Sequence, residues 1–422
     1  MARSAISNFL ADTWWYGLTT RLSRDAFERL AALRADQGFS AVQLVVGIPP
    51  EVGPQNENAR SEVGTAWAIS GEFNSAYLSL ARDRIRTLNN LGLTVAVYGA
   101  WGHQIAWLGE DRMAQWWLEL ITALDALDVI YVLCGESNLW VGRESMLLPD
   151  KSTDDLARRW VRSQLGPRLA DFIRRFANRV DRQLGLRSRL RREKLERRRR
   201  AWGYVLERIS TQTERPILVH PTSTETGYEA VPNPGRLSAN TAQTGHDPRA
   251  RNRIWRLPLE LSREGRAVGG YVNLEPWYEG IGGRFWGEDQ LFAYWASMLA
   301  GATAHCYGAH GVWNVGDGAF LSHWGDQTFE QAVALDTPRL LGLSHAQYLD
   351  WLTSEGESFY QEEDGDLISI GRRSPKGSVS FFPEVSRAPE VPQGQVWLPM
   401  AGNVVGTVPA DGQVVVFSRF EG

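Results

Sequence analysis

Cysteine is scarce in this 422-residue chain, and its two copies, Cys134 and Cys306, stand far apart inside apolar runs. They indicate buried free thiols and exclude the disulfide framework that supports many small secreted domains. The chain also lacks a run of eighteen apolar residues, so no membrane-spanning helix is expected. Because the N-terminal segment lacks the apolar core of a signal peptide, we expect a cytoplasmic protein.

The chain has no strong excess of one charge, since 45 lysines and arginines face 49 aspartates and glutamates, for a net charge of −4. This balance excludes a general attraction to nucleic acid or to acidic membranes. No glycine-rich phosphate loop opens a helix after the first expected strand, so nucleotide binding is not indicated. We therefore expect no cofactor, no nucleic acid and no membrane among the partners of this protein.

Tryptophan is abundant instead, with eighteen copies. Its flat apolar face and polar edge suit the faces and hydroxyls of sugar rings, although an aromatic-rich core would also use many copies. Hydrophobic residues make up 43% of the chain and charged residues 22%, as in ordinary globular proteins. The length accommodates one α/β barrel of about 250 residues with additions.

Strand-like and helix-like runs alternate through most of the chain, which is the pattern of parallel βα units. We predict a (β/α)8 TIM barrel over residues 1–354. Past residue 355 the helical pattern gives way to short strands separated by turn residues, which predicts a small antiparallel β-sandwich over residues 355–422. The eight barrel strands are expected at residues 8–14, 40–48, 93–99, 129–134, 216–220, 237–243, 269–275 and 302–307.

An arginine-rich insertion at about 150–212 is longer than one barrel helix requires. Apolar residues recur at helical spacing over 169–180, so much of the insertion is expected to be amphipathic helix. The basic run at 187–200 suggests nucleic-acid binding. A solvated helical face is the better interpretation, because acidic residues pair with arginines four positions on and no aromatics interrupt the run.

Two carboxylates stand where strands are expected to end. Glu275 follows the strand-like run 271–274 and precedes Pro276, which cannot donate to a sheet ladder. Glu136 follows the apolar run 129–134. The carboxyl ends of barrel strands carry the active site in this fold, although a glutamate there also serves as a helix cap or a rim salt bridge.

Carboxylates at the ends of the fourth and seventh strands form the pair that a retaining glycosidase uses. One protonates the leaving oxygen and the other attacks the anomeric carbon, at a separation of roughly 5 to 5.5 Å. The apolar surroundings of Glu136 suit the acid, whose pKa must be raised, and Glu275 suits the nucleophile. We therefore predict a retaining glycoside hydrolase that cleaves an oligosaccharide by double displacement.

The motifs that follow support this interpretation. The run VNLEPWYEG at 272–280, followed by FAYWASMLAGATAHCYGAHGVWN at 292–314, resembles the apiosidase-like family of (β/α)8 glycoside hydrolases. Weaker motifs in matching order are ADTWW at 11–15, GAWG at 99–102, LCGE at 133–136 and AQTGHD at 242–247. The resemblance covers most of residues 5–350. The tail resembles the small β-domain labelled collagen-binding in such proteins.

Carried over by position, the resemblance implies Glu136 as general acid/base and Glu275 as nucleophile. The chain departs from the family at two places, since the family often has aspartate at the position of Glu136 and commonly glycine at that of Leu274. Glutamate reaches one methylene further than aspartate, so a cleft shaped for a different sugar is one interpretation.

Further residues at or just past the expected strand ends are predicted to contact sugar. Trp14 and Trp313 have an alternative place in the core, whereas a polar QTGH cluster ending a buried strand is better explained by function. The predicted set is Asp12, Trp14, Trp101, His103, Gln243, His246, Trp277, Tyr278, Glu279, Tyr307 and Trp313.

Alternative functions remain open. A non-catalytic carbohydrate-binding barrel would use the aromatics, but it has no need of two strand-end carboxylates. A sugar isomerase or lyase would call for a metal cluster or a lysine base, and neither is evident. His305, Cys306 and His310 are close in sequence, but their spacing is not that of a common zinc site, so no metal is predicted.

Overall fold

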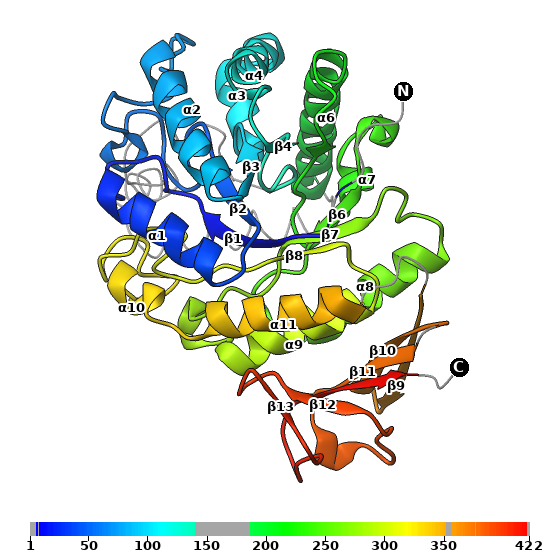
Figure 1. The fold of residues 1–422 in the computed structure, drawn as a ribbon. Coiled ribbons are helices and arrows are strands. Elements are labelled where there is room, and N and C mark those ends of the chain that lie inside the picture. Colours follow the sequence, from blue (N-terminus) through cyan, green and yellow to red (C-terminus); the bar gives the residue numbers. More distant parts are fainter. Residues whose placement is uncertain (1–5, 7, 140–185, 352–355, 376, 420–422) are drawn as a thin grey trace, which may run out of the picture.

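The computed structural model describes residue 6 and residues 8–139, 186–351, 356–375 and 377–419. Eight strands form a parallel barrel sheet, with helices packed around its outside (Figure 1). The hydrogen-bonded order of the strands is β5-β4-β3-β2-β1-β8-β7-β6. The barrel strands are β1 (Leu10–Trp14), β2 (Ala41–Val45), β3 (Thr94–Tyr98), β4 (Val129–Val132), β5 (Ile217–Leu218), β6 (Asn240–Gln243), β7 (Tyr271–Glu275) and β8 (Ala304–Cys306).

Strands β5 and β6 meet through single hydrogen bonds rather than a ladder. The Ser238 N–H donates to the Ile217 carbonyl at 2.9 Å, and the Ile217 N–H donates to the Ser238 hydroxyl at 3.1 Å. The Thr241 hydroxyl also donates to the Val219 carbonyl. These contacts bring the two ends of the sheet together, so the carboxyl ends of all eight strands surround one opening.

The helices begin where the sequence supplies caps. Ser23 accepts from the Ala26 N–H at the start of α1, and Asn74 accepts from the Tyr77 N–H at the start of α2. The α-helices are α1 (Arg24–Asp36), α2 (Ser75–Asn90), α3 (Ile105–Leu108), α4 (Glu110–Leu124), α6 (Leu186–Ile209), α7 (Gly227–Ala230), α8 (Arg251–Arg263), α9 (Gly287–Leu299), α10 (Phe329–Val333) and α11 (Thr337–Trp351). Short 3-10 turns are η1 (Glu57–Ala59), η2 (Gly102–Gln104), η3 (Pro234–Arg236), η4 (Pro248–Ala250), η5 (Ile281–Gly283) and η6 (Val385–Arg387).

The predicted barrel is confirmed, and each of the eight strands lies within its expected segment. The basic run belongs to helix α6, whose C-terminal part buries Trp202, Val205 and Leu206. The amphipathic helix predicted over 169–180 lies outside the described residues, as does most of the predicted insertion.

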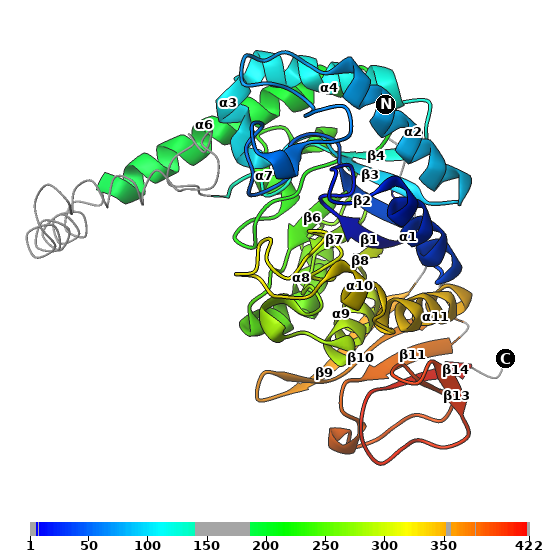
Figure 2. The same ribbon diagram turned by 90° about the vertical axis from the view of Figure 1, so that its left-hand side faces the viewer.

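The C-terminal segment forms a separate antiparallel sheet of six strands, as the sequence predicts in outline. Figure 2 shows this sheet stacked against α9 and α11 of the barrel. Aromatic contacts join the two, with Trp351 and Phe417 at 5.0 Å and Phe292 and Phe381 at 6.2 Å between ring centroids. In the order β13-β12-β14-β11-β10-β9, the strands are β9 (Glu357–Glu363), β10 (Asp366–Ser374), β11 (Gly377–Phe382), β12 (Gln395–Leu398), β13 (Asn403–Val405) and β14 (Val414–Arg419).

Both cysteines are free and buried, as the sequence indicates. Burial raises the pKa of both thiols, so neither is a reactive thiolate near neutral pH. Within the described ranges, no helix has the length and apolar character that crossing a membrane requires.

Candidate active site

Glu275 is the last residue of β7, where Pro276 stops the strand. Its side chain is buried, and its Oε1 accepts hydrogen bonds from Gln243 Nε2 at 2.7 Å and from His246 Nε2 at 2.9 Å. Among the residues that the structure describes, no hydrogen bond to its Oε2 is found, and His220 Nε2 lies 3.7 Å from this oxygen, beyond hydrogen-bond distance. One oxygen of Glu275 is therefore held and the other has free lone pairs.

The tautomer of His246 follows from its second contact. The Tyr278 N–H donates to His246 Nδ1 at 3.2 Å, so Nδ1 carries no proton and Nε2 carries it. His246 thus donates from Nε2 to Glu275 in its neutral form. The backbone of Tyr278, two residues after Pro276, therefore helps to orient the carboxylate that precedes this proline.

Glu136 follows β4 in a strained backbone conformation, with φ at 45°. Few residues other than glycine adopt this left-handed region, and such strain clusters at functional sites. Its Oε2 accepts from Trp101 Nε1 at 3.0 Å. The Trp101 ring reaches this position because Gly135 has no side chain: a Cβ there would come within 2.4 Å of the ring.

A single amide nitrogen joins the two carboxylates. Gln243 Nε2 lies 2.7 Å from Glu275 Oε1 and 3.3 Å from Glu136 Oε1. The two oxygens are therefore at most 6.0 Å apart, the sum of those distances. The ends of β4, β6 and β7 thus bring two buried carboxylates and one shared donor into the same small volume.

The two carboxyl groups have different acidities. Burial raises the pKa of Glu136 from its ordinary 4.5 to about 7, and the neighbouring charge of Glu275 adds to this shift. Burial acts on Glu275 in the same direction, but the hydrogen bonds from His246 and Gln243 and the nearby imidazole of His220 outweigh it and lower the pKa. Near neutral pH, Glu136 is poised to hold a proton while Glu275 is ionised.

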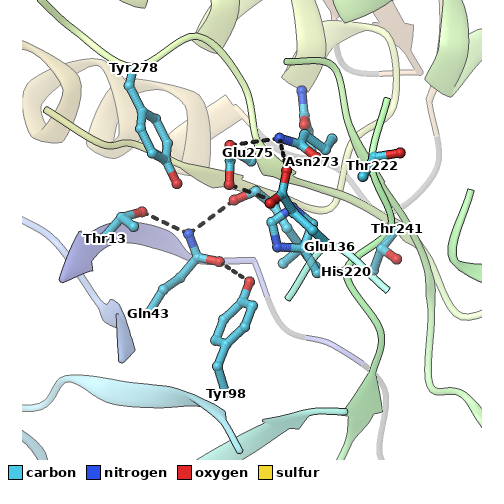
Figure 3. Close-up of polar contacts among 12 residues, drawn as sticks. Thr13, Gln43, Tyr98, Glu136, His220, Thr222, Thr241, Asn273, Glu275 and Tyr278 are labelled. Carbon is cyan, nitrogen blue, oxygen red and sulfur yellow. Dashed lines mark hydrogen bonds and ion pairs between the residues drawn. The ribbon is translucent and has the colours of Figure 1, made fainter. Parts of the chain in front are cut away.

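A hydrogen-bonded chain lies beside the pair and joins four strands of the barrel (Figure 3). Gln43 Nε2 donates to the Thr13 hydroxyl at 2.8 Å and to the Leu274 carbonyl at 3.0 Å, and its Oε1 accepts from the Tyr98 hydroxyl at 2.5 Å. Gln43 thereby fixes the backbone one residue before Glu275. The sequence offered a signal for Gln43, a polar residue inside the apolar run AVQLV, which our sequence reasoning did not use.

His220 is a second residue that the sequence reasoning missed. It follows β5, is fully buried, and contacts the rings of Tyr98 and Trp101 with centroid distances of 5.8 and 6.2 Å. Figure 3 shows it gathered with Glu136 and Glu275. Burial lowers the pKa of His220 to about 4, so it is neutral near pH 7. The sequence could have indicated His220 as a site residue, because it ends an apolar run and precedes a proline, as Glu275 does.

A cavity of about 720 Å³ opens beside the pair. It is lined by Glu136, Gln243 and His246, and much of its remaining wall is polar, including Asn138 and Thr222 to Glu225. This volume lies within the range of about 300–1,000 Å³ that is usual for ligand sites. The cavity is therefore large enough to hold a ligand that extends beyond the atoms that react.

Three of the predicted sugar contacts bond to the pair, and two more follow from His246 in a row of aromatic rings. Trp101, Gln243 and His246 bond to the carboxylates directly. The Tyr278 ring is 4.7 Å from that of His246, and the Trp313 ring is 6.4 Å from that of Tyr278.

The other six predicted contacts lie elsewhere in the described structure. Asp12 accepts from Arg34 of α1 at 2.7 Å and from Trp14 Nε1 at 2.8 Å, so both residues of β1 face the helix layer. Glu279 accepts from the hydroxyls of Tyr307 at 2.6 Å and Thr337 of α11 at 2.7 Å.

The remaining two of these six also have structural partners. His103 packs against Trp107 of α3 at 5.1 Å between ring centroids, and Trp277 stacks on Phe285 at 4.8 Å. Trp277 also donates from Nε1 to the Asp247 carbonyl at 3.0 Å.

The histidines and cysteine near β8 do not form a metal site. His305 packs against Tyr294 of α9 at 5.3 Å between ring centroids, whereas His310 donates from Nε2 to the Gly325 carbonyl at 2.7 Å. Among the residues that the structure describes, no group of three or more His, Cys, Asp or Glu side chains is arranged to hold a metal ion.

The fold has solved counterparts among glycoside hydrolases. A glycoside hydrolase family 5 protein from Bacteroides vulgatus ATCC 8482 superposes with a TM-score of 0.68 at 12% identity, over 98% of this chain and 88% of that one. A structure described as "Glycoside hydrolase" gives 0.69 at 13%, over 98% and 92%. A third, described as a "putative glycoside hydrolase" from the same Bacteroides strain, gives 0.55 at 11%, over 100% and 79%. Comparison with curated proteins finds no significant match.

The fold is a (β/α)8 barrel of the kind that these solved structures share. The family described as "Apiosidase-like, catalytic domain" matches residues 7–348, and the chain belongs to it. The resemblance noted in the sequence is thus confirmed. Family and fold together support glycosidase activity.

Proposed function

We propose that this protein is a retaining glycoside hydrolase in which Glu136 is the general acid/base and Glu275 the nucleophile. One observation carries the proposal: Gln243 Nε2 contacts both carboxylates, which limits the distance between their two Oε1 atoms to 6.0 Å. Retaining enzymes separate the two groups by about 5 to 5.5 Å, whereas inverting enzymes need about 6.5 to 9.5 Å for a water between them. The contrast in pKa between Glu136 and Glu275 supports this division of roles.

In the first step, Glu275 Oε2 attacks the anomeric carbon of the sugar. This oxygen is free, whereas Oε1 is held by Gln243 and His246. Glu136 gives its proton to the glycosidic oxygen as that bond breaks. Trp101 Nε1 donates to Glu136 Oε2 at 3.0 Å, whereas Gln243 Nε2 donates to Oε1 at the longer distance of 3.3 Å, so the oxygen with the weaker hydrogen bond, Oε1, carries the proton.

In the second step, Glu136 has lost its proton and acts as a base. It takes a proton from a water molecule that attacks the same anomeric carbon from the face the leaving group has vacated, and the bond to Glu275 breaks. The anomeric configuration is retained because it is inverted twice. The substrate that fits the cavity of about 720 Å³ is an oligosaccharide.

Hydrolysis of a panel of aryl α- and β-glycosides, pentofuranosides included, tests the proposal. We expect cleavage by the unmodified protein and losses on the order of 10⁴-fold in Glu136→Ala and Glu275→Ala. Glu260→Gln, at an exposed carboxylate of α8, is the matched control and should cleave at the wild-type rate. Proton NMR of the first product should show retention of configuration.

Three outcomes would contradict the proposal. Cleavage unaffected by either alanine variant would place the active site elsewhere, and an inverted first product would exclude the double displacement. Binding of oligosaccharides without hydrolysis by the unmodified protein would instead favour a carbohydrate-binding barrel.

A further inference from the structure

Trp324 is a large side chain that is left exposed at the wall of the catalytic cavity. Its relative exposure is 37%, and it lines the cavity that Glu136 also lines. An indole in this position presents a flat apolar face, which packs against the face of a sugar ring. The sequence reasoning did not single out this tryptophan.

Two contacts from different loops fix the orientation of Trp324. Its Nε1 donates to Glu51 Oε1 at 2.6 Å, and its carbonyl accepts from the Gly282 N–H at 2.5 Å. Glu51 lies in the loop after β2 and Gly282 in η5 after β7. The indole is therefore held before any ligand arrives, and less conformational freedom is lost on binding.

The backbone of Glu51 has an unusual conformation at the residue that bonds to Trp324. Its φ is 64°, in the left-handed region that residues with a side chain rarely occupy. Its second oxygen, Oε2, lies 3.2 Å from His323 Nε2. Both carboxylate oxygens of Glu51 are thus directed at the loop that carries Trp324.

The position of the cavity relative to the pair indicates which part of a substrate it holds. Glu136 lines it, whereas Glu275 does not. Since the general acid faces the leaving oxygen, the space beside it belongs to the leaving group. Part of the wall is formed by hydroxyls and an amide: Asn138 Nδ2 donates to Thr224 Oγ1 at 3.0 Å, and the hydroxyls of Thr222 and Thr224 are 3.1 Å apart. Such groups suit sugar hydroxyls better than an apolar aglycone.

We propose that Trp324 is the stacking platform of a leaving-group subsite that binds a sugar ring, and that Glu51 is the residue that positions it. The substrate then extends by at least one sugar residue beyond the cleaved bond on the leaving-group side. This proposal rests on the glycosidase function proposed above.

The test separates binding of the leaving group from cleavage. An array of plant and microbial cell-wall oligosaccharides is probed with two proteins. One is Glu275→Gln, which should bind the substrate without cleaving it, and the other is the double variant that carries both Glu275→Gln and Trp324→Ala. We expect Trp324→Ala to weaken binding to the glycans that Glu275→Gln retains by about five- to tenfold, the effect of losing one aromatic contact. Hydrolysis of aryl glycosides by the Trp324→Ala single variant should fall by less than its glycan binding does, because an aryl leaving group reaches the subsite but carries no sugar hydroxyls for its polar wall.

Substitutions at Glu51 test whether this residue positions Trp324 through its hydrogen bond or whether any change at Glu51 disturbs the fold. Glu51→Gln keeps an oxygen acceptor for Trp324 Nε1 and should bind glycans nearly as well as its parent, whereas Glu51→Ala should lose as much as Trp324→Ala. Trp286, which is 43% exposed and does not line the cavity, is the matched control: Trp286→Ala should leave glycan binding unchanged.

Several results would overturn the inference. Unchanged glycan binding in Trp324→Ala would show that Trp324 is not a stacking platform. A fall in aryl glycoside hydrolysis as large as the fall in glycan binding would place Trp324 at the reacting sugar instead. Failure of Glu275→Gln to bind any arrayed glycan, while the wild type cleaves aryl glycosides, would exclude the subsite and leave the glycosidase proposal intact. Aryl and glycan cleavage that persists in Glu275→Gln would reject the proposed function itself.

Discussion

Replacing Glu136 by Gln should stabilise the protein at alkaline pH, and this result can be measured without knowing the substrate. The pKa of Glu136 is about 7 in the folded protein, against an ordinary 4.5. Between these values the folded state holds one proton that the unfolded state has released, so the free energy of unfolding falls by about 1.4 kcal/mol per pH unit. The stabilisation from this group is full below pH 4.5 and is lost as the pH rises through 7.

Over that interval of about 2.5 pH units, the wild type loses about 3 kcal/mol relative to a variant that does not titrate there. Gln has the shape of protonated Glu, so Glu136→Gln should match the wild type near pH 5 and exceed it by about 3 kcal/mol at pH 8. Urea unfolding at intervals from pH 5 to pH 8 measures this difference.

Glu260→Gln is the matched control for the loss of one negative charge, and its unfolding curve should follow the wild type at every pH. The reasoning would be refuted if the Glu136→Gln and wild-type stabilities ran parallel across the pH range. A wild type that is more stable than Glu136→Gln at pH 8 would show that its partners favour the ionised form of Glu136.

Three further predictions concern activity on whichever aryl glycoside is cleaved. The rate constant kcat/KM of the wild type should fall above about pH 7, where Glu136 loses the proton it must donate, and a profile flat to pH 9 would argue against it as the acid. Gln243→Met removes a donor that lowers the pKa of both carboxyls, so both limbs of the pH profile should move upward and kcat should fall about tenfold or more; unmoved limbs would contradict the bridging role. Gly135→Ala places a Cβ against the Trp101 ring and should cost about 1–3 kcal/mol of stability and most of the activity, whereas Gly235→Ala, which has open space, should change neither in the same assays.

The sequence was sufficient for the barrel and for the positions where its chemistry could lie. Alternating apolar runs located all eight strands, and the carboxylates at the carboxyl ends of β4 and β7 marked the candidate pair. This works because strand ends are set locally, by apolar residues that favour a strand and by glycine or proline that stops it. The antiparallel C-terminal sheet was evident for the same reason.

Which side chains face into the barrel was decided by the tertiary structure alone. Successive residues of a strand point to opposite sides, so Thr13 bonds to Gln43 inside the barrel while its neighbours Asp12 and Trp14 face α1. A strand buried on both faces carries no alternating pattern from which this choice could be made. The same ambiguity explains why Tyr307 was expected at the site although it contacts Glu279 outside it.

Contacts between distant segments were likewise beyond the sequence. Gln243 was expected near the site, but its shared contact with Glu136 and Glu275 depends on where three strand ends meet. The place of Trp324 at the cavity wall depends on Glu51, which is 273 residues away along the chain. The sequence by itself determined the fold and the chemical groups available, and the packing of loops around one barrel opening decided which of those groups act together.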